Sequence, residues 1–356
     1  MEKQIGFGIV GAGLIAPFHL KAVRDAKGGY AVGVFDIDKA KAQKTAQDFN
    51  IKTFETLEQM LADKNIDVVC VATPNHLHRD TVIKASQAGK HVLTEKPPAM
   101  SLGETDEMIE ACQRANVKFG CFVQCRIRKA IQAMKKAIES GRFGKLLHAD
   151  AYMKWYRGQD YYTSAGWRGQ QKSGSGVTVA QGFHYIDLIQ YLAGPAAKVE
   201  AKMTNIAHPG INLEDDVVAH LEYANGCKGV VQLSTALWPG TDIRIEINGT
   251  KGTAVMIGEK MQTWKFQEEK PEDAGIRNIG NAAQATGAGG AADFGHIDHT
   301  AVVQDMIDSI KNNKEVVIPV KSVRATLEII LAMYQSAKSG KTICSPFKDD
   351  KKIWID

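Results

Sequence analysis

The chain has 356 residues, 44% of them hydrophobic and 24% charged, with a formal net charge of +4. Its length predicts two domains, and its composition excludes a disordered, collagen-like or disulfide-framework protein. There is no apolar run of about 20 residues, no basic run and no CxxC pair, which argues against a membrane span, a nucleic-acid partner and a zinc finger.

The first third of the chain alternates between strand and helix patterns. Buried strands are predicted at residues 5–10, 30–35, 67–72, 91–94 and 118–123. Helices are predicted between them at 14–26, 39–49, 56–62, 77–88 and 102–115. This alternation is typical of a doubly wound parallel sheet, so we expect an α/β domain over residues 1–124.

After residue 124 the alternation stops, and longer strands joined by turns replace it. Strands are predicted at 146–153, 199–206, 217–223, 228–237, 241–248 and 253–257, and helices at 185–192 and 299–312. We expect a second α/β domain over 125–356, with a large, open, mainly antiparallel sheet and with a final helix and tail that pack back on the first domain. Few helices cover such a sheet, so self-association is expected to bury its open face.

A glycine turn follows the first predicted strand. Gly11-x-Gly13-x-x-Ala16 lies between an apolar strand and a helix, where a dinucleotide fingerprint is found. Gly11 permits the tight turn and Gly13 leaves room for a pyrophosphate. The amides of Leu14 and Ile15, at the start of the helix, would hold its charge. Short turns of this kind also join strands to helices without binding any ligand.

Asp36 stands at the end of the second predicted strand. A carboxylate in this position accepts hydrogen bonds from the adenosine ribose and repels a 2′-phosphate. The sequence therefore predicts NAD as the cofactor in preference to NADP. The alternative is a solvated acid at the end of a strand, a role that Asp38 would share.

Two further segments follow predicted strands, at the edge where open α/β sheets bind ligands. They are Thr73-Pro74-Asn75-His76-Leu77-His78 and Glu95-Lys96-Pro97. With the glycine turn, Asp36 and Gly89-Lys90-His91-Val92, they resemble the Gfo/Idh/MocA family of NAD(P)-dependent oxidoreductases, which includes glucose–fructose oxidoreductase and inositol dehydrogenase. The likeness covers nearly the whole chain, through residues 155–157, 167–169, 182–187 and 299–312.

The resemblance implies a Rossmann domain, a second α/β domain with an open sheet, an active site between them, and pairing through that sheet into a homodimer or homotetramer. It also implies cofactor contacts beyond the glycine turn and Asp36, namely Thr73, Pro74, Asn75, His78, Glu95, Lys96, Gln124, Trp167 and Arg168. A cytoplasmic location is the default expectation, because the start of the chain lacks the pattern of a signal peptide.

Lys96 and His184 are the candidate catalytic residues. Oxidation of a secondary alcohol needs a base for the hydroxyl proton, while the nicotinamide takes the hydride. A free lysine has a pKa of about 10.4, which desolvation and the positive charge of oxidised nicotinamide would lower. His184 matches the active-site histidine of the family, which implies that it bonds the reacting hydroxyl or relays its proton. The alternatives are a surface lysine and a capping or core histidine.

The chain departs from the family pattern at Ala180. Many members have an acid or an amide four residues before the histidine, where it partners the lysine and the substrate. The alanine side chain can neither orient Lys96 nor accept a hydrogen bond from a substrate hydroxyl. We expect this segment to be extended, so that the side chain of Gln181 points to the opposite face.

Residues 155–162 are rich in aromatic and hydrogen-bonding side chains, so substrate contacts are expected there. Further contacts are expected near the candidate catalytic residues. Aromatic rings suit the apolar C–H faces of a sugar and polar groups suit its hydroxyls. Such loops also fill cores or join subunits, and both interpretations remain open. The candidates are Arg126, Tyr156, Arg157, Tyr162, Gln181 and Asp187.

Two features remain without assigned chemistry. The Gly/Ala-rich residues 278–292 are either a lid or a disordered insertion. His296 and His299 have no other ligating residues near them in the sequence, so no metal site is predicted.

The leading hypothesis is an NAD-dependent oxidoreductase that acts on a secondary hydroxyl, or the matching ketone, of a sugar, cyclitol or glycoside. Two alternatives remain open. One is an enzyme with tightly held NAD that cleaves glycosides or transfers hydride between sugars. The other is a catalytically retired NAD-binding sensor or assembly subunit.

Overall fold

The computed structural model describes residues 3–164, 166, 168–170, 173, 174, 176–280 and 295–347. The chain divides into two compact units, Met1–Gln124 with Gly295–Arg324, and Cys125–Phe294 with Ala325–Asp356. The predicted cofactor contact Trp167 and most of the Gly/Ala-rich segment, residues 281–292, lie outside the described residues. No described helix is long and apolar enough to cross a membrane.

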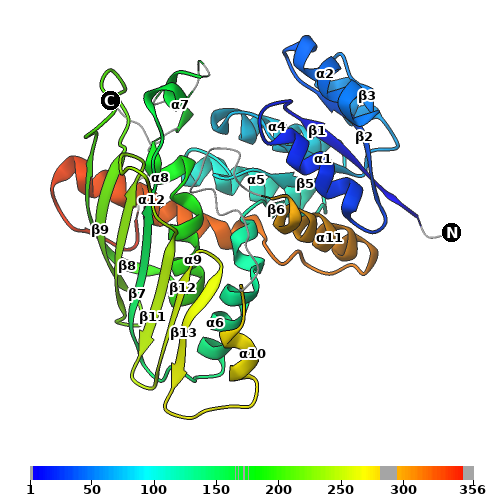
Figure 1. Cartoon of the computed structure of the whole chain (residues 1–356). Coiled ribbons are helices and arrows are strands. Elements are labelled where there is room, and N and C mark those ends of the chain that lie inside the picture. The colour runs from blue at the N-terminus through cyan, green and yellow to red at the C-terminus, as the bar shows by residue number, and fades with distance from the viewer. Residues whose placement is uncertain are drawn as a thin grey trace. The chain divides into compact units, whose positions relative to one another are not determined.

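The first unit contains a six-stranded sheet in the order β3-β2-β1-β4-β5-β6, with all neighbouring strands parallel (Figure 1). Its strands are β1 (Ile5–Val10), β2 (Gly29–Phe35), β3 (Lys52–Thr53), β4 (Val68–Val71), β5 (His91–Thr94) and β6 (Phe119–Cys121). Every residue of β1 and β4 is buried, which explains their continuous apolar sequence. The predicted doubly wound sheet is confirmed, and its strand order reverses beside β1, where such sheets bind ligands.

Helices connect these strands along the chain. They are α1 (Ala16–Asp25), α2 (Lys39–Phe49), α3 (Leu57–Ala62), α4 (His78–Gln87), which follows a 3-10 turn at Asn75–Leu77, and α5 (Leu102–Arg114). The side chains of Asp38, Thr56 and Ser101 cap α2, α3 and α5 by accepting backbone amides. The chain returns to this unit as α11 (Ile297–Lys311), which packs against α1.

The second unit is built on an eight-stranded sheet in the order β13-β12-β11-β7-β10-β9-β8-β14. Its strands are β7 (Leu146–Lys154), β8 (Ala196–Thr204), β9 (Asp216–Tyr223), β10 (Lys228–Ser234), β11 (Arg244–Gly249), β12 (Gly252–Ile257), β13 (Lys260–Phe266) and β14 (Ile343–Cys344). Strands β7 and β10 are parallel, and every other neighbouring pair is antiparallel. The prediction of a large, mainly antiparallel sheet is confirmed.

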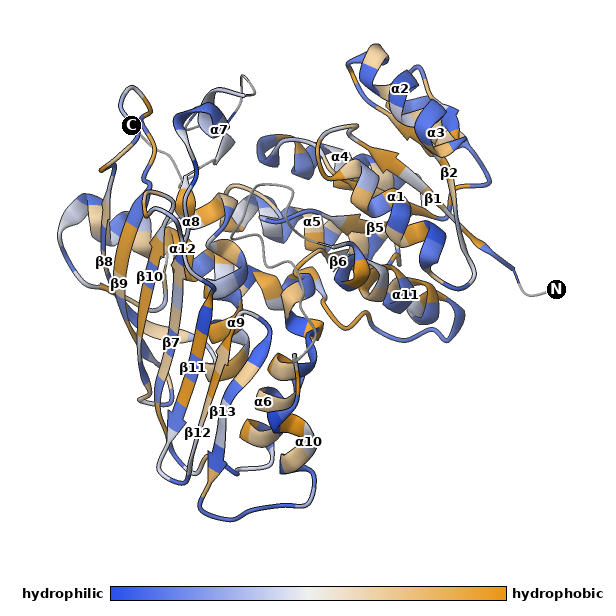
Figure 2. Ribbon diagram, viewed as in Figure 1, coloured by the Kyte–Doolittle hydropathy of each residue, from blue (hydrophilic) through white to orange (hydrophobic). Residues whose placement is uncertain are grey.

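Helices lie along one face of this sheet (Figure 1). The helices of the unit are α6 (Lys129–Glu139), α7 (Gln159–Thr163), α8 (Val177–Ala180), α9 (Phe183–Ala193), α10 (Asp273–Arg277) and most of α12 (Val320–Ser339). Helix α9 packs on β7 and β11. Along β8, Val199 and Ala201 are buried whereas Glu200 and Lys202 are exposed, an alternation that Figure 2 shows in the strand colours.

Candidate active site

The glycine turn after β1 has the geometry expected of a phosphate site. Gly11 has a φ of +104°, and a Cβ on it would lie 2.5 Å from the carbonyl oxygen of Ala72. A Cβ on Gly13 would meet nothing within 4 Å, so this residue faces open space. Among the described residues, the amides of Leu14 and Ile15 have no hydrogen-bond acceptor. Unsatisfied amides beside open space fit a pyrophosphate.

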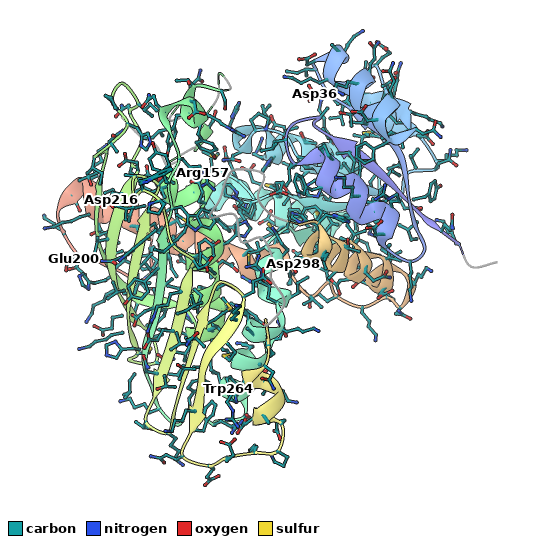
Figure 3. All side chains as sticks on the ribbon, in the orientation of Figure 1. Asp36, Arg157, Glu200, Asp216, Trp264 and Asp298 are labelled. Carbon is teal, nitrogen blue, oxygen red and sulfur yellow. The ribbon has the colours of Figure 1, made fainter. Side chains whose placement is uncertain are left out.

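Asp36 joins the end of β2 to this turn (Figure 3). Its Oδ2 accepts the Ala12 amide at 2.7 Å, and its Oδ1 accepts the Asp38 amide at 2.8 Å. An ionised carboxylate has about four lone-pair sites, so both oxygens retain capacity for ribose hydroxyls. Asp38 instead accepts the Lys41 amide and caps α2. The residues present therefore fit the adenosine half of a dinucleotide.

Two buried polar atoms near the ends of β4 and β6 have no hydrogen-bond partner within the described structure. They are the Thr73 hydroxyl, after β4, and the side-chain oxygen of Gln124, after β6. Between Thr73 and α4, Pro74 and Asn75 are half-buried. Buried polar atoms are normally satisfied, so these two fit a place where a bound group supplies the missing bonds.

His78, a predicted cofactor contact, links two segments of the first unit. It is fully buried at the start of α4. Its Nδ1 lies 2.8 Å from the Pro97 carbonyl oxygen and its Nε2 lies 2.9 Å from that of Thr73. Both ring nitrogens thus face the backbone, and His78 ties the segment after β4 to the segment after β5.

Glu95 and Lys96 follow β5 and are both half-buried, and the Lys96–Pro97 peptide is cis. Glu95 Oε1 lies 2.9 Å from His19 Nε2, and Oε2 accepts the Lys96 amide at 3.3 Å. Burial opposes ionisation of Glu95. The contact with His19 and the charges of His19, His299 and Lys96 outweigh burial and lower the carboxyl pKa to about 2.

His299 lies beside ligating side chains that are distant from it in the sequence. His19, Glu95 and His299 present ligand-type atoms that lie within 4.8 Å of one another. They come from α1, the segment after β5, and α11, which are far apart in the sequence. Spacing along the chain therefore gave no signal for this cluster.

In the second unit, His184 lies in the first turn of α9 and is half-buried. Helix α8 leads into it. The carboxylate of Glu214 accepts the Thr178 amide at 3.1 Å and so caps α8, and burial raises its pKa. A Cβ on Gly182 would lie 2.4 Å from Leu233 of β10, so glycine permits this close packing beside His184.

The prediction that Gln181 lies in an extended segment is wrong. Helix α8 ends at Ala180, and Gln181 has φ −114° and ψ −46°, in the helical region. Helical neighbours differ in direction by about 100°, so Gln181 does not point opposite to Ala180. Its Nε2 donates to the Tyr161 hydroxyl at 2.8 Å, and its Oε1 is buried with no hydrogen-bond partner among the described residues. That oxygen is an acceptor which alanine lacks.

Arg126 and Asp187, both predicted as substrate contacts, bind each other. Arg126 is 2% exposed and Asp187 is fully buried. The guanidinium donates Nε and Nη2 to the two carboxylate oxygens, each at 2.6 Å, and Thr326 adds a third bond at 2.6 Å. This ion pair fastens α9 to the segment before α6 and to α12.

The aromatic loop divides between core and surface. Tyr162 is buried, and its hydroxyl lies 2.7 Å from that of Thr235. Tyr156 is exposed and its ring contacts the exposed Trp238, with ring centres 5.1 Å apart. Arg157 (Figure 3) is buried beside Trp155. Tyr162 therefore fills the core, as one of the two interpretations of this loop expects.

Arg168 and Arg157 both lie over the ring of Tyr161, which sequence reasoning did not single out. The Arg168 guanidinium is 4.7 Å from the ring centre and that of Arg157 is 5.9 Å from it. His208, a second missed residue, lies 2.7 Å from the Arg157 carbonyl oxygen through Nε2 and 2.7 Å from Asp215 through Nδ1. The buried His208–Asp215 pair fixes the backbone at Arg157.

Models of one known protein family match the sequence of both domains of this chain. The model described as "Oxidoreductase family, NAD-binding Rossmann fold" (GFO_IDH_MocA) matches residues 5–123, and "GFO/IDH/MocA C-terminal domain" matches residues 131–255. The solved WlbA dehydrogenase of Bordetella pertussis, in complex with NADH and UDP-GlcNAcA, is 30% identical, with a TM-score of 0.86 over 97% of this chain and 99% of that chain.

Two curated relatives extend the comparison. The 2,7-anhydro-N-acetylneuraminate hydratase of Escherichia coli (strain K12) is 28% identical over 300 residues, 80% of this chain and 79% of that protein. The scyllo-inositol 2-dehydrogenase (NAD(+)) of Bacillus subtilis (strain 168) is 28% identical over 270 residues, 72% of this chain and 75% of that protein.

Proposed function

Because the chain belongs to the Gfo/Idh/MocA oxidoreductase family, we propose that it transfers hydride between NAD and a secondary hydroxyl, or the matching ketone, of a sugar, cyclitol or glycoside. The observation that carries the proposal is that open phosphate-binding space, Asp36, the unsatisfied Thr73 hydroxyl and Lys96 all follow strand ends of one parallel sheet. The substrates in the relatives' names support the carbohydrate class.

Lys96 and His184 are the proposed catalytic residues. When bound, the nicotinamide accepts or returns the hydride. Lys96 in its neutral form takes the hydroxyl proton during oxidation, and its ammonium returns the proton during reduction. His184 is proposed to hydrogen-bond the reacting hydroxyl. Gln181 Oε1 is the acceptor proposed to replace the acid or amide that this chain lacks at position 180.

NAD rather than NADP is the proposed cofactor, because Asp36 follows β2, and a carboxylate at that position repels a 2′-phosphate. We also propose a homo-oligomer formed through the face of the eight-stranded sheet opposite its helices (Figure 1). That face carries the row Glu200, His220, Val230, Asp150 and Glu246 on adjacent strands. A broad sheet face of this kind supports self-association, which would cover it.

Steady-state assays test the proposal. Purified protein is mixed with NAD or NADP and a panel of pyranosides, inositols and 3-keto sugars, and the absorbance of reduced nicotinamide is followed. We expect turnover with at least one member, and a decrease of at least ~10² in turnover for Lys96→Met, since general acid–base catalysis contributes about that much. Absence of any nicotinamide oxidation or reduction would count against the proposal.

Two further outcomes identify the alternatives. The Escherichia coli relative is named a hydratase, and addition of water is a net reaction without oxidation. Products are therefore also analysed without added NAD, where turnover would indicate a tightly held cofactor. Tight NAD binding with no product from any sugar would indicate a retired sensor.

A further inference from the structure

Three buried side chains of the first unit meet beside Lys96, and we call them the His19–Glu95–His299 cluster. His19 and His299 are almost fully buried. Their rings are 5.5 Å apart, centre to centre, and the ring of Phe122 packs against both, at 4.1 Å from His19 and 5.7 Å from His299. The cluster thus places one carboxylate and two imidazoles in apolar surroundings.

We propose that this cluster sets the protonation of Lys96, because His19 and His299 compete with the Lys96 ammonium for the negative charge of Glu95. The inference rests on the proposed function, in which Lys96 exchanges the proton of the reacting hydroxyl. It makes His19, Glu95 and His299 positioning residues, which act on the reaction through Lys96.

The contacts of Glu95 support this role. One carboxylate oxygen lies 2.9 Å from His19 Nε2 and the other accepts the Lys96 amide at 3.3 Å. Glu95 therefore fixes the backbone of Lys96 through one carboxylate oxygen, and its other oxygen faces His19 on α1. The positive charge of Lys96 favours the Glu95 carboxylate, and pairwise electrostatic coupling is reciprocal, so the carboxylate equally favours the Lys96 ammonium. A histidine that also interacts with the Glu95 carboxylate weakens the stabilisation of the Lys96 ammonium.

Other titratable groups near Glu95 do not supply a counter-charge. Burial, and then the charge of Glu95, raises the pKa of the Cys70 thiol on β4, which stays neutral. Burial lowers the pKa of His78 on α4 although Glu95 opposes this, so its ring is neutral at pH 7. Among the described residues, His19, His299 and Lys96 are the groups whose interactions lower the pKa of this carboxyl.

Two substitutions in the cluster are expected to move Lys96 in opposite directions. Glu95→Gln removes the negative charge, so the Lys96 ammonium is less favoured and its pKa falls. His19→Leu leaves the Glu95 charge to Lys96, so the Lys96 pKa rises. Each shift is expected to be about one pH unit, the usual effect of a charge at this range. A general loss of packing would not produce opposite signs.

The first measurement does not need activity. Acetic anhydride modifies only the neutral amine, and mass spectrometry of the peptide containing Lys96 gives the extent of modification at each pH. The second measurement is the acidic limb of kcat/KM for oxidation of the best sugar in the panel, which reports the free enzyme's essential base. The limb is expected to move to lower pH in Glu95→Gln and to higher pH in His19→Leu.

The double variant and a matched control complete the design. In His19→Leu/Glu95→Gln, loss of the histidine should add no further shift, because the charge through which it acts is gone. His299→Leu is expected to shift Lys96 in the same direction as His19→Leu. His91→Gln alters another histidine of this unit, at the opposite end of β5, and should shift neither measurement.

Shifts of the same sign in the two single variants, or no shift in the modification profile, would overturn the inference. So would a rate that is lost with a chelator and restored by Zn²⁺, since two imidazoles and a carboxylate are also a zinc ligand set. If the modification profile shifts as expected but Lys96→Met keeps full turnover, the cluster stands and the proposed catalytic role of Lys96 fails.

Discussion

Asp36 bears on cofactor choice through a single charge. In Asp36→Asn one acceptor oxygen remains for the Ala12 amide while the charge that repels a 2′-phosphate is removed. A hydrogen bond to a charged group contributes about 1.5–3 kcal/mol, so kcat/KM with NAD should fall at least ~10-fold. The same quantity with NADP should rise. Steady-state kinetics with both cofactors measures the ratio, and an unchanged ratio would contradict the assignment of Asp36.

At the scale of single residues, the sequence predicts features that depend on short spacing. The Gly11 turn and Asp36 are predicted from one strand–helix–strand unit, and the structure adds that Asp36 accepts the Ala12 amide beside Gly11. The direction of Gln181 could not be predicted, because the cap that makes α8 helical comes from Glu214, far along the chain. Likewise, His78 matches a motif, yet its partners Thr73 and Pro97 follow two different strands.

At the scale of elements, the Arg126–Asp187 ion pair is expected to hold the second unit's helices together. Arg126→Met leaves the buried Asp187 carboxylate without its cation, which should cost about 3–5 kcal/mol of the free energy of unfolding. Arg126→Met/Asp187→Leu should recover most of that loss. Urea unfolding followed by circular dichroism measures both variants.

The exposed Arg114–Glu110 pair on α5 provides the control for this comparison. Arg114→Met should change the free energy of unfolding by about 0.5 kcal/mol or less. If Arg126→Met were no more destabilising than this control, Arg126 and Asp187 would not form the pair in solution, and a role in substrate binding would again be open.

Local periodicity predicts many of the strands and helices, but the predictions include neither β13 nor α6. The sequence does not predict β13, because its alternation of buried and exposed residues changes phase between Met261 and Trp264. Its pairing with β12 shifts register at the same place. The helical spacing of Ile131, Met134 and Ala137 in the sequence indicates helix α6, which buries these side chains. Helix limits agree with the structure within about two residues where caps such as Ser101 are local.

At the scale of the whole molecule, the uncovered sheet face is proposed to join subunits. Val230 lies on this face, and its amide donates to Asp150 at 2.7 Å. Val230→Lys would place an ammonium beside Asp150, which a single chain tolerates, but which a subunit interface would have to bury. Light scattering after size exclusion should therefore show a dimer or tetramer for the wild type and single chains for the variant.

Lys44→Ala, an exposed change on α2, serves as the control and should leave the assembly unchanged. A wild-type protein that elutes as a single chain at micromolar concentration would contradict the proposal. Loss of folding in Val230→Lys is checked by circular dichroism, so that dissociation and unfolding are distinguished.

The sequence predicts which segments form the two sheets better than it predicts which distant segments pack against them. The first unit includes residues returning after position 294, and these bring His299 to His19 and Glu95. No local pattern encodes that meeting, because buried contacts between remote segments depend on the packing of α11 against α1. Motifs therefore identified Lys96, whereas only the fold showed the groups that surround it.

Lys96 is proposed to exchange the proton during hydride transfer, and amine rescue of Lys96→Ala tests this role most directly. Single-turnover rates of nicotinamide reduction are measured with the best sugar of the panel, with and without added ethylamine, after NADH binding has been shown to be intact. We predict a rate at least ~10² below that of the wild type, partly restored in proportion to ethylamine concentration. A Lys96→Ala rate within about twofold of the wild type would contradict this role of Lys96.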